Sequence, residues 1–239
     1  MRYPTGKLAL AGFDLSVEAG ELVVVLGGNG SGKTTLLRCI SRMLRPSAGE
    51  IWLNDTNLAA LSGERLRQAR LPLAMIWQQA SLVRRRSVLS NVAAGALGRY
   101  GGLWTALGGL PAVERRAAHD HLRAVGLAAL AGQRAGTLSG GQARRVAIAR
   151  ALAQRPQVLL ADEPVASLDP EAADDIMRLL RHLATHEHLA VLCVLHQVEL
   201  AYGYGDRVVG IRDGTIAFDR PSAELSRDAV RQLYLNEAA

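Results

Sequence analysis

The stretch Gly27-Gly28-Asn29-Gly30-Ser31-Gly32-Lys33-Thr34 decides the fold predicted for this sequence. It matches the pattern G-x-x-x-x-G-K-[ST] at every fixed position. Because glycine has no Cβ atom, successive backbone N–H groups can wrap around phosphate oxygens, and a following helix adds further N–H donors. The apolar run Leu22–Leu26 before the stretch is typical of a parallel strand covered on both faces. We expect a helix to follow from Lys33 until Pro46, so the stretch is predicted to be a phosphate-binding loop.

Three residues at the end of this loop have distinct predicted tasks. Lys33 is placed to neutralise the β- and γ-phosphates of a nucleotide, and Thr34 to offer its hydroxyl to Mg²⁺. Thr35 is placed for the α-phosphate. A dinucleotide-binding loop does not fit, because no G-x-G-x-x-G register is present and a lysine stands at the helix start.

A pair of carboxylates completes the predicted site. The apolar run Val158–Ala161 predicts a buried strand, and Asp162 follows at its carboxyl end, where α/β sheets place ligands. Asp162 can hold Mg²⁺ through a water molecule. Glu163 is close enough to the γ-phosphate to polarise an attacking water as general base. Together with the loop, these residues predict hydrolysis of a nucleoside triphosphate.

Strand and helix patterns alternate on both sides of a segment of different character. Residues 87–155 are rich in Ala, Leu, Arg and Gly with helical spacing, and we expect a helical subdomain interrupted at Gly101-Gly102 and residues 108–111. Residues 1–86 and 156–239 are expected to form an α/β core with a mostly parallel sheet. Its further predicted elements are strands at 13–18, 50–54 and 189–195, a helix at 171–185, a hairpin at 208–218 around Asp213-Gly214, and a last helix near 222–234.

Composition narrows the class of protein. The chain has 239 residues, of which 49% are hydrophobic and 21% charged, values that exclude a disordered protein. Cys39 and Cys193 lie in apolar runs, which favours buried free thiols in a reducing compartment. No run reaches the roughly 18 apolar residues of a membrane span. The apolar run Leu8–Phe13 is too short for a signal peptide, so we expect a cytoplasmic protein that reaches a membrane only through a partner.

A second helix start has the chemistry of an anion site. The residues Leu138-Ser139-Gly140-Gly141-Gln142 precede a helical pattern, with Ser139 as a good N-cap residue and the glycines exposing N–H groups. The first loop already supplies enough donors for its own nucleotide. The residues alone therefore leave this second site unexplained.

With these motifs the sequence resembles the ATP-binding subunits of ABC transporters over essentially its whole length. LSGGQ at 138–142 matches the family signature, and Gln78 matches the glutamine of the Q-loop, with Gln79 as the alternative register. Asp169 matches the D-loop, His196 the switch histidine, and Tyr3 the aromatic residue that stacks on adenine. The resemblance implies a P-loop NTPase (RecA-like) core with a mostly parallel sheet, an antiparallel β subdomain and an inserted α-helical subdomain. It also implies ATP and Mg²⁺ as ligands.

The resemblance also implies a residue set and a dimer. The nucleotide-binding residues would be Tyr3, Gly27, Gly28, Asn29, Gly30, Ser31, Gly32, Lys33, Thr34, Thr35 and Gln78, and the Mg²⁺ residues Thr34, Gln78 and Asp162. Two ATPase subunits would face each other head to tail, either two copies of this chain or this chain and a second kind of ATPase subunit. Ser139, Gly140, Gly141 and Gln142 of one would then close on the γ-phosphate held at Lys33 of the other. His196 would contact that phosphate and help hold Glu163, while Gln78 would report the state of the site to a membrane permease.

Several local stretches look most like the ATPases of phosphonate importers: 82–83 with Arg85, 87–89, 91–92, 95–98, 161–170 and 195–198. The segment 204–212 also suits a compact importer subunit. This implies uptake of a phosphonate or related oxyanion such as phosphite, with a permease, a periplasmic solute-binding protein, and a place at the cytoplasmic face of the inner membrane. An importer for another small solute is the near alternative. A soluble ATPase acting on nucleic acid is disfavoured because no second ATPase domain or coiled-coil array is present, and no nucleic-acid partner is expected. Arg84-Arg85-Arg86 is either a rim for the permease or a solvated charge run.

Overall fold

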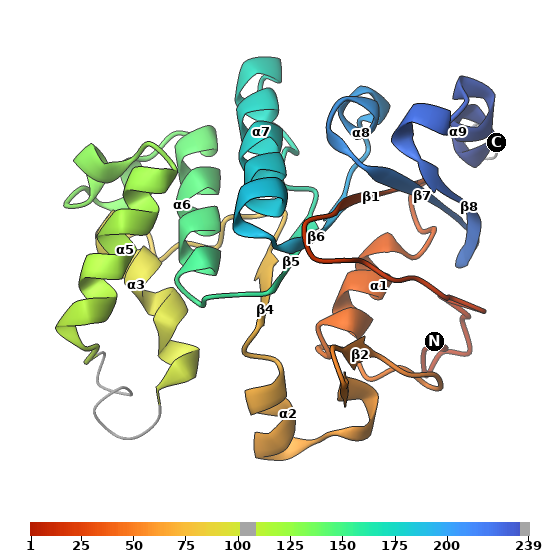
Figure 1. Cartoon of the computed structure of the whole chain (residues 1–239), viewed down its shortest axis with the longest axis horizontal. Coiled ribbons are helices and arrows are strands. Elements are labelled where there is room, and N and C mark those ends of the chain that lie inside the picture. Colours follow the sequence, from red (N-terminus) through yellow and green to blue (C-terminus); the bar gives the residue numbers. More distant parts are fainter. Residues whose placement is uncertain (101–108, 235–239) are drawn as a thin grey trace.

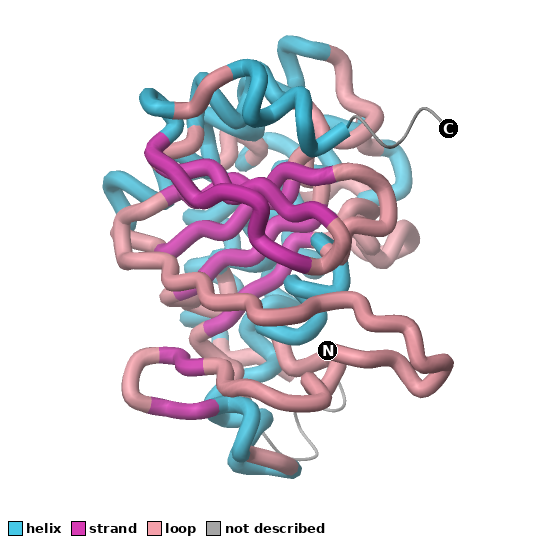
Figure 2. The backbone as a smooth tube through the Cα atoms, turned by 90° about the vertical axis from the view of Figure 1, so that its right-hand side faces the viewer, coloured by secondary structure: helices cyan, strands magenta, loops and turns pink. Residues whose placement is uncertain are grey.

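The computed structural model describes residues 1–100 and 109–234, so the predicted breaks at Gly101-Gly102 and Gly108 lie outside the described residues. A six-stranded sheet forms the core, in the order β4-β5-β6-β1-β7-β8. Its strands are β1 (Leu22–Gly27), β4 (Leu73–Ile76), β5 (Val158–Asp162), β6 (Ala190–Val194), β7 (Arg207–Arg212) and β8 (Thr215–Pro221). All neighbours pair in parallel except β7 and β8, which are antiparallel. Figure 2 shows these strands stacked into one twisted sheet with helices around it.

Both faces of the sheet are covered, which explains the unbroken apolar run of β1. Every residue of β1 is buried, and alternate side chains enter different cores. Val23 and Val25 pack toward α1 (Lys33–Ile40) on one face, whereas Leu22, Val24 and Leu26 join the larger core on the other. That larger core lies under α7 (Pro170–Glu187), α8 (Val198–Tyr204) and α9 (Arg227–Tyr234), as Figure 1 shows.

The inserted segment lies at one end of the molecule (Figure 1, left) and is helical in the part that the structure describes. It contains α3 (Val88–Ala93), α5 (Ala112–Ala124) and α6 (Gly140–Leu152). Short 3-10 helices connect the elements of the chain: η1 (Leu58–Ala60), η2 (Ala94–Arg99), η3 (Ala128–Leu130), η4 (Ala135–Thr137) and η5 (Ser222–Glu224). The fold class predicted from the sequence is confirmed, while the subdomain boundaries at 87 and 155 stay predictions.

Residues 13–18 differ from the prediction of a strand. Phe13, Leu15 and Val17 are half-buried against the core on the α1 side and their neighbours are exposed, so the alternation is real. No strand forms, because no neighbouring segment supplies a ladder of hydrogen bonds to this stretch among the described residues. Side-chain alternation reports which face is covered, and it does not report whether the backbone has a partner.

Local backbone geometry corrects two other predictions and confirms a third. Helix α1 ends at Ile40 instead of near Pro46, because the backbone of Arg42 turns left-handed, with φ 53°, and the chain leaves the helix there. The strand expected at 50–54 shrinks to β2 (Trp52–Leu53), which pairs with β3 (Thr56–Asn57). The hairpin around Asp213-Gly214 is confirmed, with φ values of 50° and 76° that suit a two-residue turn.

The sequence patterns did not predict β3, α2 (Gly63–Ala69), β4 or α8. β4 has only four residues, too few for a periodic signal, and is defined by its pairing with β5. Across residues 1–100 and 109–234, none of the helices has both the length and the apolar composition that a membrane crossing needs.

Candidate active site

The loop between β1 and α1 folds around the side chain of Lys33. The Lys33 Nζ atom donates hydrogen bonds to the backbone oxygens of Gly27, at 2.7 Å, and Gly28, at 2.8 Å. Gly32 has φ 112°, and a Cβ atom there would lie 2.7 Å from the oxygen of Ala9. Only glycine fits this point, where the chain enters α1 without a side-chain cap. The ammonium group is thus held inside the loop, beside the open helix start whose N–H groups favour an anion.

Two buried oxygens beside this loop lack hydrogen-bond partners among the described residues. One is Oγ of Ser31, and the other is Oδ1 of Asp162, at the carboxyl end of β5. Asp162 is only 6% exposed and is hydrogen-bonded to Thr34. Burial, with repulsion from Glu163, raises the pKa of the Asp162 carboxyl group. Buried polar atoms without a hydrogen-bond partner are expected where a functional site binds an ion or a ligand.

The donor set around Asp162 fits Mg²⁺. A carboxylate oxygen that no hydrogen bond satisfies lies beside a hydroxyl group, and Mg²⁺ takes oxygen ligands of this kind. Within the described part of the chain, no three His, Cys, Asp or Glu side chains converge as a metal-binding group. Mg²⁺ is usually held by one or two protein oxygens together with substrate phosphates.

Three predicted residues meet at the ends of adjacent strands. Gln78 follows β4, Glu163 follows β5 and His196 follows β6. The Gln78 side chain donates through Nε2 to Oε2 of Glu163 at 2.9 Å, and Nε2 of His196 lies 2.6 Å from Oε1 of Glu163. It is therefore the side chain of Gln78, and not that of the neighbouring Gln79, that contacts the Glu163 carboxylate. The sheet order β4-β5-β6 is the reason that these distant residues come together.

Tyr3 lies beside the first turn of α1. Its hydroxyl shares a hydrogen bond of 3.0 Å with the hydroxyl of Thr35. Thr35 is the residue expected at the α-phosphate, and the stacking of the Tyr3 ring on adenine stays a prediction.

The LSGGQ residues begin α6 with a reciprocal cap. Ser139 Oγ accepts from the backbone N–H of Gln142 at 3.2 Å, and Gln142 Oε1 accepts from that of Ser139 at 3.0 Å. A Cβ atom on Gly140 or Gly141 would come within 3.5 Å of Leu168 or Ala172 near the start of α7. Asp169 caps α7 by accepting from the N–H of Ala172. Figure 1 shows α6 separated from α1 by α7, so the structure does not bring this helix start to the phosphate loop of its own chain.

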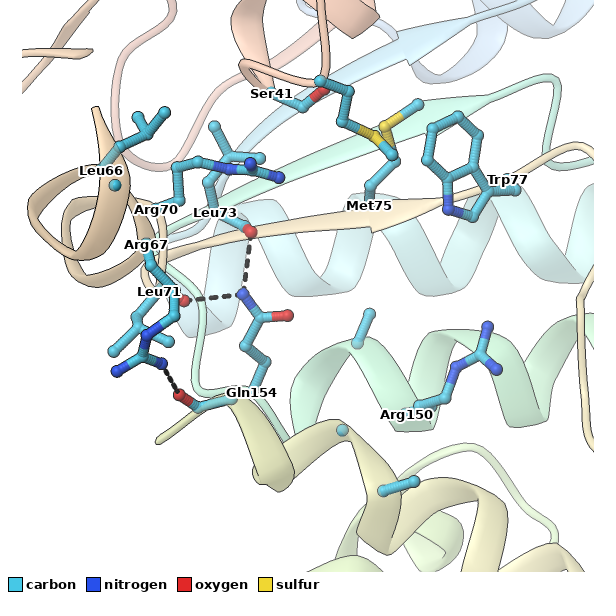
Figure 3. Close-up of a pocket in the computed structure, with 16 residues that line it drawn as sticks. Ser41, Leu66, Arg67, Arg70, Leu71, Leu73, Met75, Trp77, Arg150 and Gln154 are labelled. Carbon is cyan, nitrogen blue, oxygen red and sulfur yellow. Dashed lines mark hydrogen bonds between the residues drawn. The ribbon is translucent and has the colours of Figure 1, made fainter. Parts of the chain in front are cut away.

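Side chains along α6 and just after its end were not identified from the sequence, although they hold the segment that carries Gln78. Arg144 donates to the backbone oxygen of Trp77, and Arg150 to those of Ala80 and Ser81. Gln154 donates to the oxygens of Leu71 and Leu73 at the start of β4 (Figure 3). These arginines look like scattered helix-surface residues in the sequence, and only tertiary structure reveals their partners.

A cavity of about 560 Å³ separates α2, β4 and α6 (Figure 3). Met43, Leu66, Met75 and Trp77 contribute apolar walls. In Figure 3 the guanidinium of Arg70 extends toward Met75. Neither a hydrogen bond nor an ion pair engages this guanidinium within residues 1–100 and 109–234, and burial, with repulsion from Arg42, lowers its pKa.

A phosphate loop closed over a buried lysine, with carboxylates at the ends of neighbouring parallel strands, defines a P-loop nucleoside triphosphatase. The sequence profile described as ABC transporter matches residues 10–166, and this chain belongs to that family. It is an ABC-type ATPase, which binds ATP and hydrolyses it to ADP and phosphate.

Relatives and solved structures agree with this assignment. The chain is 50% identical over 228 residues to the phosphonates import ATP-binding protein PhnC of Frankia casuarinae, covering 95% of this chain and 90% of the relative. The protein of that name from Wolinella succinogenes is 44% identical, with 99% and 86% covered. The dimeric ATP-binding cassette MJ0796 bound to ADP and Pi is similar with TM-score 0.78, 31% identity and 90% of both chains covered. The ADP conformation of the cassette MJ1267 has TM-score 0.86, 26% identity, and 98% and 95% covered.

Proposed function

We propose that this chain is the ATP-hydrolysing subunit of an importer that takes up phosphonate, or a related phosphorus oxyanion, through a membrane permease. The observation that carries the proposal is the identity of 44% to 50% with proteins named for phosphonate import, over nearly the whole chain. The Glu163 carboxylate, held between Gln78 and His196, supports the hydrolytic role. The ATPase works at the cytoplasmic face of the inner membrane as a peripheral subunit, and a periplasmic solute-binding protein delivers the solute to the permease.

Hydrolysis at this site follows from the positions of its side chains. Lys33 and the loop N–H groups bind the phosphates. Thr34 and Asp162 would hold Mg²⁺, which would neutralise charge on the phosphate oxygens. Each carboxylate oxygen of Glu163 can accept a second hydrogen bond. The carboxylate can therefore accept a proton from an attacking water while Gln78 and His196 keep it in place.

The LSGGQ residues act on the nucleotide of a second subunit. Ser139 and Gly140 are exposed, and α6 lies away from the phosphate loop of its own chain (Figure 1). Head-to-tail pairing of two ATPase subunits brings that helix start to the γ-phosphate at Lys33 of the partner, where its N–H groups stabilise developing charge. A solved cassette 31% identical to this chain is dimeric, which supports the pairing.

The permease docks at the cavity between α2, β4 and α6. The cavity offers apolar walls together with the guanidinium of Arg70. At the edge of the cavity, Arg150 bonds the backbone of Ala80 and Ser81, and the chain continues from there to Arg84-Arg85-Arg86. Val83, next to these exposed arginines, is 60% exposed. A permease segment with apolar and acidic side chains complements this surface. Reversal of charge in Arg85→Glu should impair assembly or transport, and full transport by an intact complex would contradict a role for Arg85.

Uptake by cells that lack this gene tests the solute. The wild-type gene should restore growth on a phosphonate or on phosphite as the phosphorus source, and the Glu163→Gln gene should not. Restored uptake of an unrelated solute, with no effect on phosphonate or phosphite, would contradict the proposed cargo while leaving the ATPase assignment intact.

A further inference from the structure

Arg144 is a buried arginine that no carboxylate neutralises in the described part of the chain. The residue is 6% exposed, and its Nη1 atom donates to the backbone oxygen of Trp77 at 2.7 Å. Its Nε atom is also buried and has no hydrogen-bond partner among the described residues. Taking a guanidinium group out of water without an opposite charge destabilises a fold, so this placement calls for a specific task.

The atom that Arg144 holds belongs to the peptide unit that leads into Gln78. A peptide group is planar, so fixing the oxygen of Trp77 also fixes the nitrogen of Gln78 and the start of its side chain. The Gln78 side chain then reaches 2.9 Å from the carboxylate of Glu163. A shift at the Trp77 oxygen would therefore displace the amide that orients this carboxylate.

The arginine projects from the helix that begins with the LSGGQ residues. Arg144 lies little more than one turn beyond Ser139 in α6. Arg150, further along this helix, donates to Ala80 and Ser81 at 2.8 Å each. Helix α6 thus holds the segment 77–81 at both ends, and the two must move together.

We propose that Arg144 is a positioning residue, which keeps Gln78 against Glu163 and transmits movement of the LSGGQ helix to that carboxylate. The inference rests on the functions proposed above for Gln78, Glu163 and the LSGGQ residues. It adds a physical link: when the first turn of α6 closes on the partner's nucleotide, Arg144 carries the new position of the helix to the hydrolytic site of its own chain.

The substitution Arg144→Met tests this link because it keeps an unbranched side chain and removes the donors. We expect kcat for ATP to fall about tenfold, a typical coupling between side chains in contact, while KM for ATP stays within about twofold. The thermal midpoint should stay equal or rise, because an unneutralised buried charge is gone. A purely structural arginine would instead lower the midpoint. Arg123→Met, at an exposed arginine of α5 with 69% of its side chain accessible, is the control and should behave as wild type.

A double-mutant cycle with Gln78→Ala identifies the route of the effect. In the Gln78→Ala background, Arg144→Met should lower kcat by less than about twofold, since its target is absent. The proposal for Arg144 alone would be overturned if Arg144→Met lowered kcat about tenfold in the Gln78→Ala background as well. It would also be overturned if Arg144→Met had a normal kcat while Gln78→Ala was impaired. A normal kcat in Gln78→Ala would overturn the function proposed for Gln78, and this inference with it. If Arg144→Met fails to fold, Arg144→Lys, which retains one donor group at a different reach, takes its place in the same cycle.

Discussion

The Nε2 atom of His196 lies 2.6 Å from the Oε1 atom of Glu163. The two residues follow the neighbouring strands β6 and β5, and their side chains are 39% and 20% exposed. The carboxylate is thus held by the imidazole ring while one side stays open to water. This combination of fixed orientation and access is what a general base in hydrolysis requires.

Glu163→Gln should abolish turnover and preserve ATP binding. The amide has the shape of the carboxylate and cannot accept the proton of an attacking water, so kcat should fall at least about 100-fold. ATP should then trap a stable dimer, which size-exclusion chromatography detects, while phosphate release measures kcat. Glu187→Gln, at the exposed far end of α7, is the matched control. Wild-type ATPase activity in Glu163→Gln would remove Glu163 from this role.

Lys33→Ala should weaken nucleotide binding. A charge-assisted hydrogen bond to a buried phosphate contributes about 2 kcal/mol, so Kd for ATP should rise about 30-fold or more, as calorimetry can measure. Lys7→Ala is the control, because Lys7 is the only other lysine in the sequence and is exposed. Equal affinity in Lys33→Ala and wild type would contradict a phosphate cradle at this loop.

Asp162→Asn should raise the Mg²⁺ requirement. An oxygen that orients a bound ion typically contributes about tenfold or more to its affinity, so the Mg²⁺ concentration for half-maximal ATPase activity should rise by that factor. Without nucleotide, the variant should be at least as thermostable as wild type, because a desolvated charge becomes neutral. Asp14→Asn, at an exposed carboxylate, serves for comparison. An unchanged Mg²⁺ titration would exclude Asp162 from the ion site.

Glu114→Gln should destabilise the helical subdomain in a pH-dependent way. Glu114 has 2% of its side chain exposed and accepts hydrogen bonds from Arg99, Tyr100 and Arg155. Its hydrogen bond from Arg99, more than any other contact, holds the pKa of the Glu114 carboxyl group below its usual value. Breaking a buried pair of this kind costs about 3 kcal/mol, which denaturant unfolding at pH 7 can measure.

The sign of the pH effect follows from that lowered pKa. The stabilisation by ionised Glu114 is fully present above the unfolded value of about 4.3 and is lost as the pH falls through the folded value. The difference in the free energy of unfolding between wild type and Glu114→Gln should therefore decrease below about pH 4.3. Glu64→Gln, which removes the exposed pair with Arg67, should change stability little at any pH. If the free energies of unfolding of wild type and Glu114→Gln differed by the same amount at every pH, the ionised pair would not be the cause of the stabilisation.

Gly95→Ala should loosen the packing of η2 on α6. A Cβ atom on Gly95 would lie 1.9 Å from the backbone oxygen of Arg150, which cannot move without distorting α6. Overpacking of this kind costs about 2 kcal/mol in the free energy of unfolding, measurable with urea. Gly132→Ala is the control, since nothing lies within 4 Å of a Cβ atom there. Equal stability of the two variants would mean that the chain relaxes without cost.

Prediction from sequence succeeded where a short local pattern carries its own physical reason. The glycine spacing of residues 27–34, between an apolar run and a helical pattern, permits a phosphate loop. The apolar runs of β1 and β5 require burial on both faces. It failed where a pattern reports only part of the answer. Residues 13–18 alternate as a strand does and still have no strand beside them. The end of α1 at Ile40 depends on the left-handed turn at Arg42, which has no glycine to announce it.

By itself, the sequence determined the phosphate loop, the carboxylates at the end of β5 and the α/β class, because each follows from neighbouring residues. Only the tertiary structure decided that Gln78 meets Glu163, 85 residues away, and that Arg144 holds the oxygen of Trp77, 67 residues away. Such contacts depend on the order of strands in the sheet and on the face that α6 turns toward β4. Helix and strand periodicities describe one element at a time, so they cannot encode which elements become neighbours.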